Sequence, residues 1–87
     1  MLIISSKNFD KSFSKLPERI KDLFEEKIEI FKIDPYNRIL RNHQLKGSLK
    51  DYRSINISGD HRLIYEQHNE DVIRLIDVGT HSQIYGK

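Results

Sequence analysis

Apolar residues in the first third of the chain recur every three or four positions, which is the spacing of one face of a helix. The pattern predicts a short helix over residues 9–16, where Ser6 or Asn8 can accept a hydrogen bond from a free N–H of the first turn. A second helix begins at Pro17, whose missing N–H costs nothing there, and ends before Pro35. The apolar positions are Phe9, Phe13 and Leu16 in the first helix, and Ile20, Leu23, Phe24, Ile28 and Phe31 in the second.

From residue 52 the spacing changes to alternation, which is typical of strands with one buried face. The alternation predicts a strand over residues 52–58, and the two turn segments that follow separate it from further strands over residues 61–67 and 72–78, which together make an antiparallel meander. The β-branched run of residues 2–5 predicts one earlier strand. The order β-α-α-β-β-β separates helices from most strands and indicates an α+β fold. We expect the two helices to pack on one face of a small, mainly antiparallel sheet, and the other, partly polar face to carry the function.

Residues 34–50 follow neither period and contain Pro35, Asn37, Asn42 and Gly47. We expect a long loop with room for one helical turn, with Leu45 reaching into the core. Loops of this length are unusual in a small domain and are often functional.

The length of 87 residues indicates one domain spanning residues 1–87. The chain has no cysteine, which excludes disulfides, thiol nucleophiles and thiolate metal sites. The apolar run at the N-terminus is too short for a signal peptide or a membrane span, so we expect a cytoplasmic protein.

The formal net charge of +2 is small, but the positive charge is concentrated in the middle of the chain. Residues 38–53 hold a single acid, Asp51, and five bases: Arg38, Arg41, Lys46, Lys50 and Arg53. Because a focused basic surface attracts polyanions, this stretch favours nucleic acid or an acidic segment as the partner.

Side chains that transfer protons or bind phosphate occur in three short stretches. His81 follows the last strand, and histidine titrates near neutral pH, which suits general acid or base chemistry. The turn "GDHR", residues 59–62, combines a carboxylate, an imidazole and a guanidinium, which converge with His81 if the turn lies beside it. The loop "NHQLKGS" contributes His43 and Lys46. Taken alone, His81 and the "NHQLKGS" loop are better explained as ordinary exposed positions, and the "GDHR" turn fits an ordinary polar hairpin as well as it fits a site.

The four histidines lack the spacing of metal ligands, and the chain has no glycine-rich phosphate loop, so we expect no metal and no cofactor. The remaining set of His, Asp, Arg, Lys and Tyr suits one reaction well. In the cleavage of RNA by its own 2′-hydroxyl the substrate carries the nucleophile, and the protein supplies a base, an acid and cations for the crowded phosphate.

The segments "HQLKGSLKDYR", "GDHRLIYE" and "LIDVGTHSQIYG", in this order after two helices, resemble the RelE/ParE superfamily of bacterial type II toxins. The chain is most similar to its YafQ-like branch of ribosome-dependent mRNA interferases. The resemblance covers the whole chain and is strongest over residues 43–86. It implies a RelE-like fold, metal-free cleavage of mRNA in the ribosomal A site, and a cognate antitoxin as the partner in a hetero-oligomer.

The resemblance also implies roles for single residues. His81 is the expected proton-transfer residue, Asp60 orients a histidine, and His43 and Tyr85 place the RNA or share in proton transfer. Arg62 falls on the RelE-branch arginine that contacts the scissile phosphate. Further RNA-binding positions are Lys46, Arg53, Arg41 and Lys50.

Two departures from the YafQ-like pattern leave the second proton-transfer group open. Asn56 stands where these proteins carry another histidine, and His61 stands where they carry tryptophan. Either His61 or His43 takes the missing role. Two other functions stay open: a ParE-like inhibitor of DNA gyrase, against which the polar set argues, and a non-catalytic RNA-binding relative, which Asn56 allows.

Overall fold

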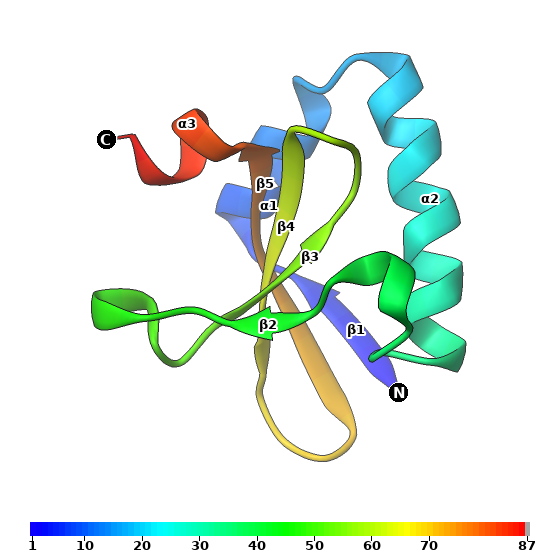
Figure 1. The fold of residues 1–87 in the computed structure, drawn as a ribbon, viewed down its shortest axis with the longest axis vertical. Coiled ribbons are helices and arrows are strands. Elements are labelled where there is room, and N and C mark those ends of the chain that lie inside the picture. The colour runs from blue at the N-terminus through cyan, green and yellow to red at the C-terminus, as the bar shows by residue number, and fades with distance from the viewer. Residues whose placement is uncertain (87) are drawn as a thin grey trace.

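The computed structural model describes residues 1–86 and shows a five-stranded sheet in the order β1-β5-β4-β3-β2 (Figure 1). The strands are β1 (Leu2–Ser5), β2 (His43–Gln44), β3 (Arg53–Asn56), β4 (His61–Gln67) and β5 (Val72–Thr80). β1 is parallel to β5, and the other neighbouring pairs are antiparallel. The predicted α+β class, with helices preceding an antiparallel meander, is confirmed.

Two helices precede the meander: α1 (Lys7–Ser14) and α2 (Glu18–Ile33). The cap of α1 is Ser6, whose Oγ accepts a hydrogen bond from the Phe9 amide at 3.0 Å and donates one to the Ile76 carbonyl at 3.0 Å. Ser6 therefore begins the helix and ties it to the sheet at the same time. Helix α2 ends at Ile33, and its C-cap residue Asp34, which precedes Pro35, has left the helical region, as predicted.

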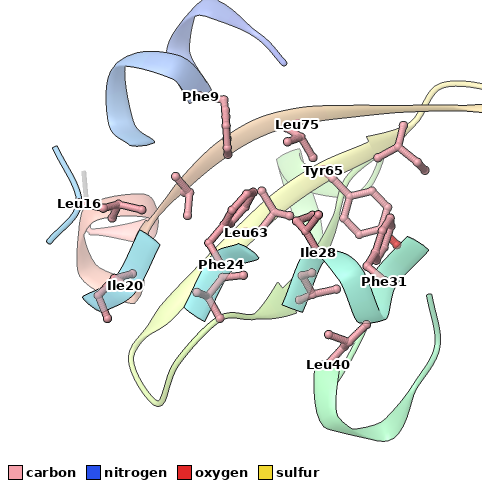
Figure 2. Close-up of a cluster of buried hydrophobic side chains, with 14 residues drawn as sticks. Phe9, Leu16, Ile20, Phe24, Ile28, Phe31, Leu40, Leu63, Tyr65 and Leu75 are labelled. Carbon is pink, nitrogen blue, oxygen red and sulfur yellow. The ribbon is translucent and has the colours of Figure 1, made fainter. Parts of the chain in front are cut away.

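The core lies between these helices and one face of the sheet (Figure 2). The predicted helical stripes supply Phe9, Leu16, Ile20, Phe24, Ile28 and Phe31, and the strands together with the residue after β3 supply Ile55, Ile57, Leu63, Tyr65, Ile73, Leu75 and Val78. Phe31 meets Tyr65 edge to face, with ring centroids 5.0 Å apart. Full burial of one large apolar side chain contributes about 1.5–3 kcal/mol, so this face supplies most of the stabilisation.

The loop between α2 and β3 is more structured than expected. It contains two 3-10 turns, η1 (Arg38–Leu40) and η2 (Gly47–Leu49), with the short strand β2 between them. The prediction that Leu45 reaches the core is wrong, because Leu40 is the residue with 0% exposure and Leu45 is half-buried on the opposite face. The chain turns directly after Leu40, where Arg41 adopts a left-handed φ of 49°.

The C-terminal segment also contains regular structure beyond the predicted strand. Strand β5 continues two residues past the predicted end, to Thr80, and α3 (His81–Tyr85) follows at once. No helix formed by residues 1–86 is long and apolar enough to cross a membrane.

Strand alternation divides the sheet residues between two faces. Leu63 and Tyr65 of β4 point into the core beneath the helices, so Arg62 and Ile64 lie on the other face, here called the open face. Ser54 pairs with Ile64 on one side and with His43 on the other, which sets these three residues in a row across the open face.

Candidate functional site

A cleft of about 290 Å³ lies on the open face, where β2, β3, β4 and α3 meet. Its lining residues are His43, Leu45, Ser54, Arg62, His81 and Tyr85. Four of them, His43, Arg62, His81 and Tyr85, are site residues expected from the sequence. The cleft thus gathers two imidazoles, a guanidinium and a phenol from segments far apart in the chain.

The start of α3 fixes His81. Thr80 caps the helix: its Oγ accepts from the Gln83 amide at 3.2 Å, while the Gln83 side chain accepts from the Thr80 amide at 2.8 Å. The His81 amide donates to the Asp60 carbonyl at 3.2 Å, which ties the helix to the β3–β4 turn. Tyr85 lies one turn further on, with its ring centroid 4.6 Å from that of His81. Both rings are therefore mounted on one capped helical turn.

Arg62 is anchored by one end of its guanidinium. Its Nη1 donates to the carbonyls of Ser58, Gly59 and His61 at 3.1, 3.3 and 3.1 Å. Among residues 1–86, no hydrogen bond or ion pair is recorded for its Nε or Nη2. The anchored Nη1 holds a permanently charged fork beside the cleft, and a fork of this kind matches a phosphate.

His43 is held in a defined tautomer on β2. Its Nδ1 lies 2.9 Å from the Arg41 carbonyl, and because a carbonyl can only accept, Nδ1 is the donor. In the neutral ring this leaves the lone pair on Nε2. His43 is exposed, so Nε2 is available to accept a proton.

The expected convergence of the "GDHR" turn with His81 is only partial. The side chain of His61 lies on the helix-covered side, where its Nδ1 is 3.0 Å from the Ser58 hydroxyl and it lines a different depression with Lys15 and Asp77. Asp60 touches His81 through its backbone carbonyl, and no hydrogen bond or ion pair of its carboxylate is recorded within residues 1–86. Of the turn's four residues, Arg62 alone lines the cleft.

The predicted RNA-binding cations lie at several places around the site. Arg53 faces the loop after α2, where its Nε donates to Asn42 Oδ1 at 2.8 Å and its guanidinium lies 5.4 Å from the Tyr36 ring. Lys46 is exposed at the start of η2, close in sequence to the cleft residue Leu45. Lys50 lines a separate depression with Arg53, and Arg41 lines a groove next to the cleft.

Two cleft residues were missed by the sequence reasoning. Ser54 is only 1% exposed, and its Oγ has no hydrogen-bond partner among residues 1–86. Leu45 was assigned to the core instead. The alternation of residues 52–58 was the available signal for Ser54, because it places this side chain on the face opposite Ile55.

Residues 1–86 contain no group of three or more His, Cys, Asp or Glu side chains that could hold a metal ion.

Comparison with known structures shows which proteins share this fold. The chain is similar to YafQ from E. coli strain BL21(DE3), with a TM-score of 0.82, 23% identity and 97% of each chain covered. It is similar to E. coli YafQ in the DinJ–YafQ toxin–antitoxin complex, with a TM-score of 0.81, 24% identity and coverage of 97% of this chain and 96% of that one. A YoeB/ParE toxin from Agrobacterium tumefaciens has a TM-score of 0.77 at 19% identity, over 93% of this chain and 99% of that one.

The chain therefore has the fold of these toxin structures. No curated protein matches the chain in sequence. The family model described as "Bacterial toxin of type II toxin-antitoxin system, YafQ" matches residues 2–86, and the chain belongs to this family. The resemblance to YafQ-like toxins that the sequence indicated is therefore confirmed at the level of the family.

Proposed function

We propose that this toxin is an endoribonuclease that cleaves mRNA in the ribosomal A site. The observation that supports the proposal is the cleft itself, which brings His43, Arg62 and His81 together on the open face. Two groups that transfer protons and one that stabilises negative charge are what cleavage by the RNA's own 2′-hydroxyl requires.

In the proposed reaction the 2′-oxygen attacks the adjacent phosphorus and the bond from phosphorus to the 5′-oxygen breaks. The products are a 2′,3′-cyclic phosphate and a free 5′-hydroxyl. His43 takes the proton of the 2′-hydroxyl, because its Nδ1 is committed to the Arg41 carbonyl and Nε2 carries the lone pair. Protonated His81 gives a proton to the departing 5′-oxygen. This assignment gives His43 the role left open by Asn56, because His61 lies outside the cleft.

Arg62 stabilises the charge that develops on the phosphorane, with the Nε and Nη2 positions directed to phosphate while Nη1 stays on the turn carbonyls. Tyr85 offers a ring on which a base can stack, and stacking of this kind contributes about 1–3 kcal/mol per base. Lys46, which is exposed and follows the cleft residue Leu45 in the sequence, adds positive charge for the RNA strand.

The proposed protein partner is an antitoxin. E. coli YafQ, which shares the fold, forms a toxin–antitoxin complex with DinJ. On this chain the basic surface of residues 38–53 is the complement of an acidic or amphipathic segment, which would cover the RNA-binding cleft in the complex.

The test is primer extension on cellular mRNA after induced expression of the wild type, His81→Ala and His68→Ala. We expect discrete cuts within codons for the wild type, and a loss of about 10²–10⁴-fold in cleavage rate for His81→Ala, since this is the usual contribution of a general acid or base. His68 is the matched control: it is an exposed histidine in the turn between β4 and β5, and its removal should change nothing.

Three other results would count against the proposal. DNA damage without mRNA cuts would favour the gyrase inhibitor. Wild-type expression with neither effect would favour a non-catalytic relative, and full cleavage by His81→Ala would remove His81 from the mechanism.

A further inference from the structure

A second groove, of about 370 Å³, lies beside the cleft on the side of α2. Its lining includes Lys27, Ile39, Arg41, Asn56 and Arg62. Arg62 lines both the cleft and this groove, so the two are contiguous on the surface. We call it the cationic groove.

The charge of the cationic groove is one-sided. Lys27, Arg41 and Arg62 border it, and no acidic side chain of residues 1–86 does. Within residues 1–86, none of the three takes part in an ion pair. Three like charges around one small concavity repel each other, and an anion placed between them relieves that repulsion.

Local structure holds two of these cations at the groove. The Lys27 ammonium donates to the Ile57 carbonyl at 3.4 Å, which fixes its half-buried side chain against the β3–β4 hairpin. Arg41 is the one non-glycine residue of residues 1–86 with positive φ. Such backbone conformations are rarely adopted by residues with a side chain and cluster at binding sites. Here the turn lets Leu40 enter the core while Arg41 borders the groove.

We propose that the cationic groove binds a phosphate group of the RNA strand adjacent to the one that reacts in the cleft. Lys27 and Arg41 are its ligands, and Arg62 lies between the two phosphates. This inference rests on the proposed ribonuclease function. An RNA strand is favoured over an acidic protein segment because Ile39 is the one large exposed apolar side chain at the groove, and protein segments depend on buried apolar anchors for affinity.

The experiment measures binding of a short single-stranded RNA that is 2′-O-methylated at every position and so cannot be cleaved. Its dissociation constant is determined as a function of salt concentration for the wild type, Lys27→Gln and Lys32→Gln. Each phosphate contact to a single strand contributes about 0.7 to the slope of log K against log salt. We expect Lys27→Gln to lower the slope by about this amount and to weaken binding at low salt, and Lys27→Arg to restore both.

Lys32→Gln is the matched control, because Lys32 lies on the same helix but pairs with Glu29 at 2.8 Å on the exposed face. It should leave the slope unchanged. Equal thermal midpoints for all variants exclude a difference in folding.

The outcomes separate this inference from the function on which it rests. A wild type that cleaves mRNA, together with a Lys27→Gln slope equal to that of the wild type, would overturn the inference and leave the function standing. A wild type that neither cleaves mRNA nor binds the RNA would overturn both. Weaker capture of the co-expressed antitoxin by Lys27→Gln, with an unchanged RNA slope, would assign the groove to the protein partner instead.

Discussion

The two faces of the sheet use the same strands for different purposes. On β3, Ile55 and Ser54 are neighbours with 0% and 1% exposure, yet Ile55 packs in the core under the helices and Ser54 lines the cleft with its hydroxyl unpaired among residues 1–86. On β4, Leu63 likewise packs in the core, and its neighbour Arg62 lines the cleft. Alternate residues therefore face the core and the cleft, and a substitution on one face can leave the other face unaffected.

The largest effect on stability is expected on the helix-covered face. Ile55→Ala removes fully buried methyl groups and leaves a cavity, which should cost about 2–5 kcal/mol of the free energy of unfolding. Urea denaturation measures the loss. Ile33→Ala, at an 88% exposed position of α2, should change stability by less than about 0.5 kcal/mol. Similar losses for the two variants would contradict the division between the faces.

A smaller effect is expected at Tyr65, which connects the core to the loop that carries His43. Its ring packs on Phe31, and its hydroxyl lies 2.7 Å from the Asn42 amide nitrogen. Burial raises the pKa of Tyr65 above its usual value, because the charged phenolate is disfavoured there. The unfolded chain therefore loses this proton first as pH rises. The contribution is fully present below about pH 10 and is lost as pH rises through the folded-state pKa.

Tyr65→Phe removes the titrating group and keeps the ring. We expect a loss of about 1 kcal/mol at neutral pH, from the hydrogen bond to Asn42, and a shallower decline of stability above about pH 10. Urea denaturation at a series of pH values measures both. An unchanged alkaline slope in the variant would show that another group controls it.

The smallest effect is expected at Ser54, although this side chain is as buried as Ile55. A buried hydroxyl without a partner is a cost to the folded state, so removing it costs nothing in hydrogen bonding. Ser54→Ala should leave the free energy of unfolding within about 0.5 kcal/mol of the wild type, or raise it. A loss above about 1 kcal/mol would show that the hydroxyl is hydrogen-bonded in solution.

The elements with a clear period were predictable from the sequence. The helical stripe from Ile20 to Phe31 and the alternation of residues 52–58 each indicate which side chains face the core, and the structure places Ile55 and Ile57 there. Strand geometry also separates His61 from Arg62, since successive strand residues point to opposite faces. Proximity in the sequence within "GDHR" therefore predicted the cleft residues less well than strand geometry does.

The missed features depend on contacts that leave little periodic signal. Helix α3 is too short for an apolar stripe, although "THSQ" carries the capping signature of a threonine followed three residues later by glutamine. Strand β2 is two residues long, and its place is set by pairing with β3. In the sequence, Lys27 looks like the other charged residues of α2, which are typical of a solvent-exposed helix face. Only the folded structure places it in the lining of the cationic groove.

The parallel pairing of β1 with β5 has a kinetic consequence. The hydrogen bond from Ser6 to the Ile76 carbonyl joins residues 70 positions apart, whereas β3, β4 and β5 pair across short turns. Closing the longer loop costs more chain entropy, and contacts of large sequence separation slow folding. In a refolding experiment followed by pulsed hydrogen exchange, the amides of the meander should gain protection before those of Leu2–Ser5. The first strand to be synthesised would thus be the last to join the sheet.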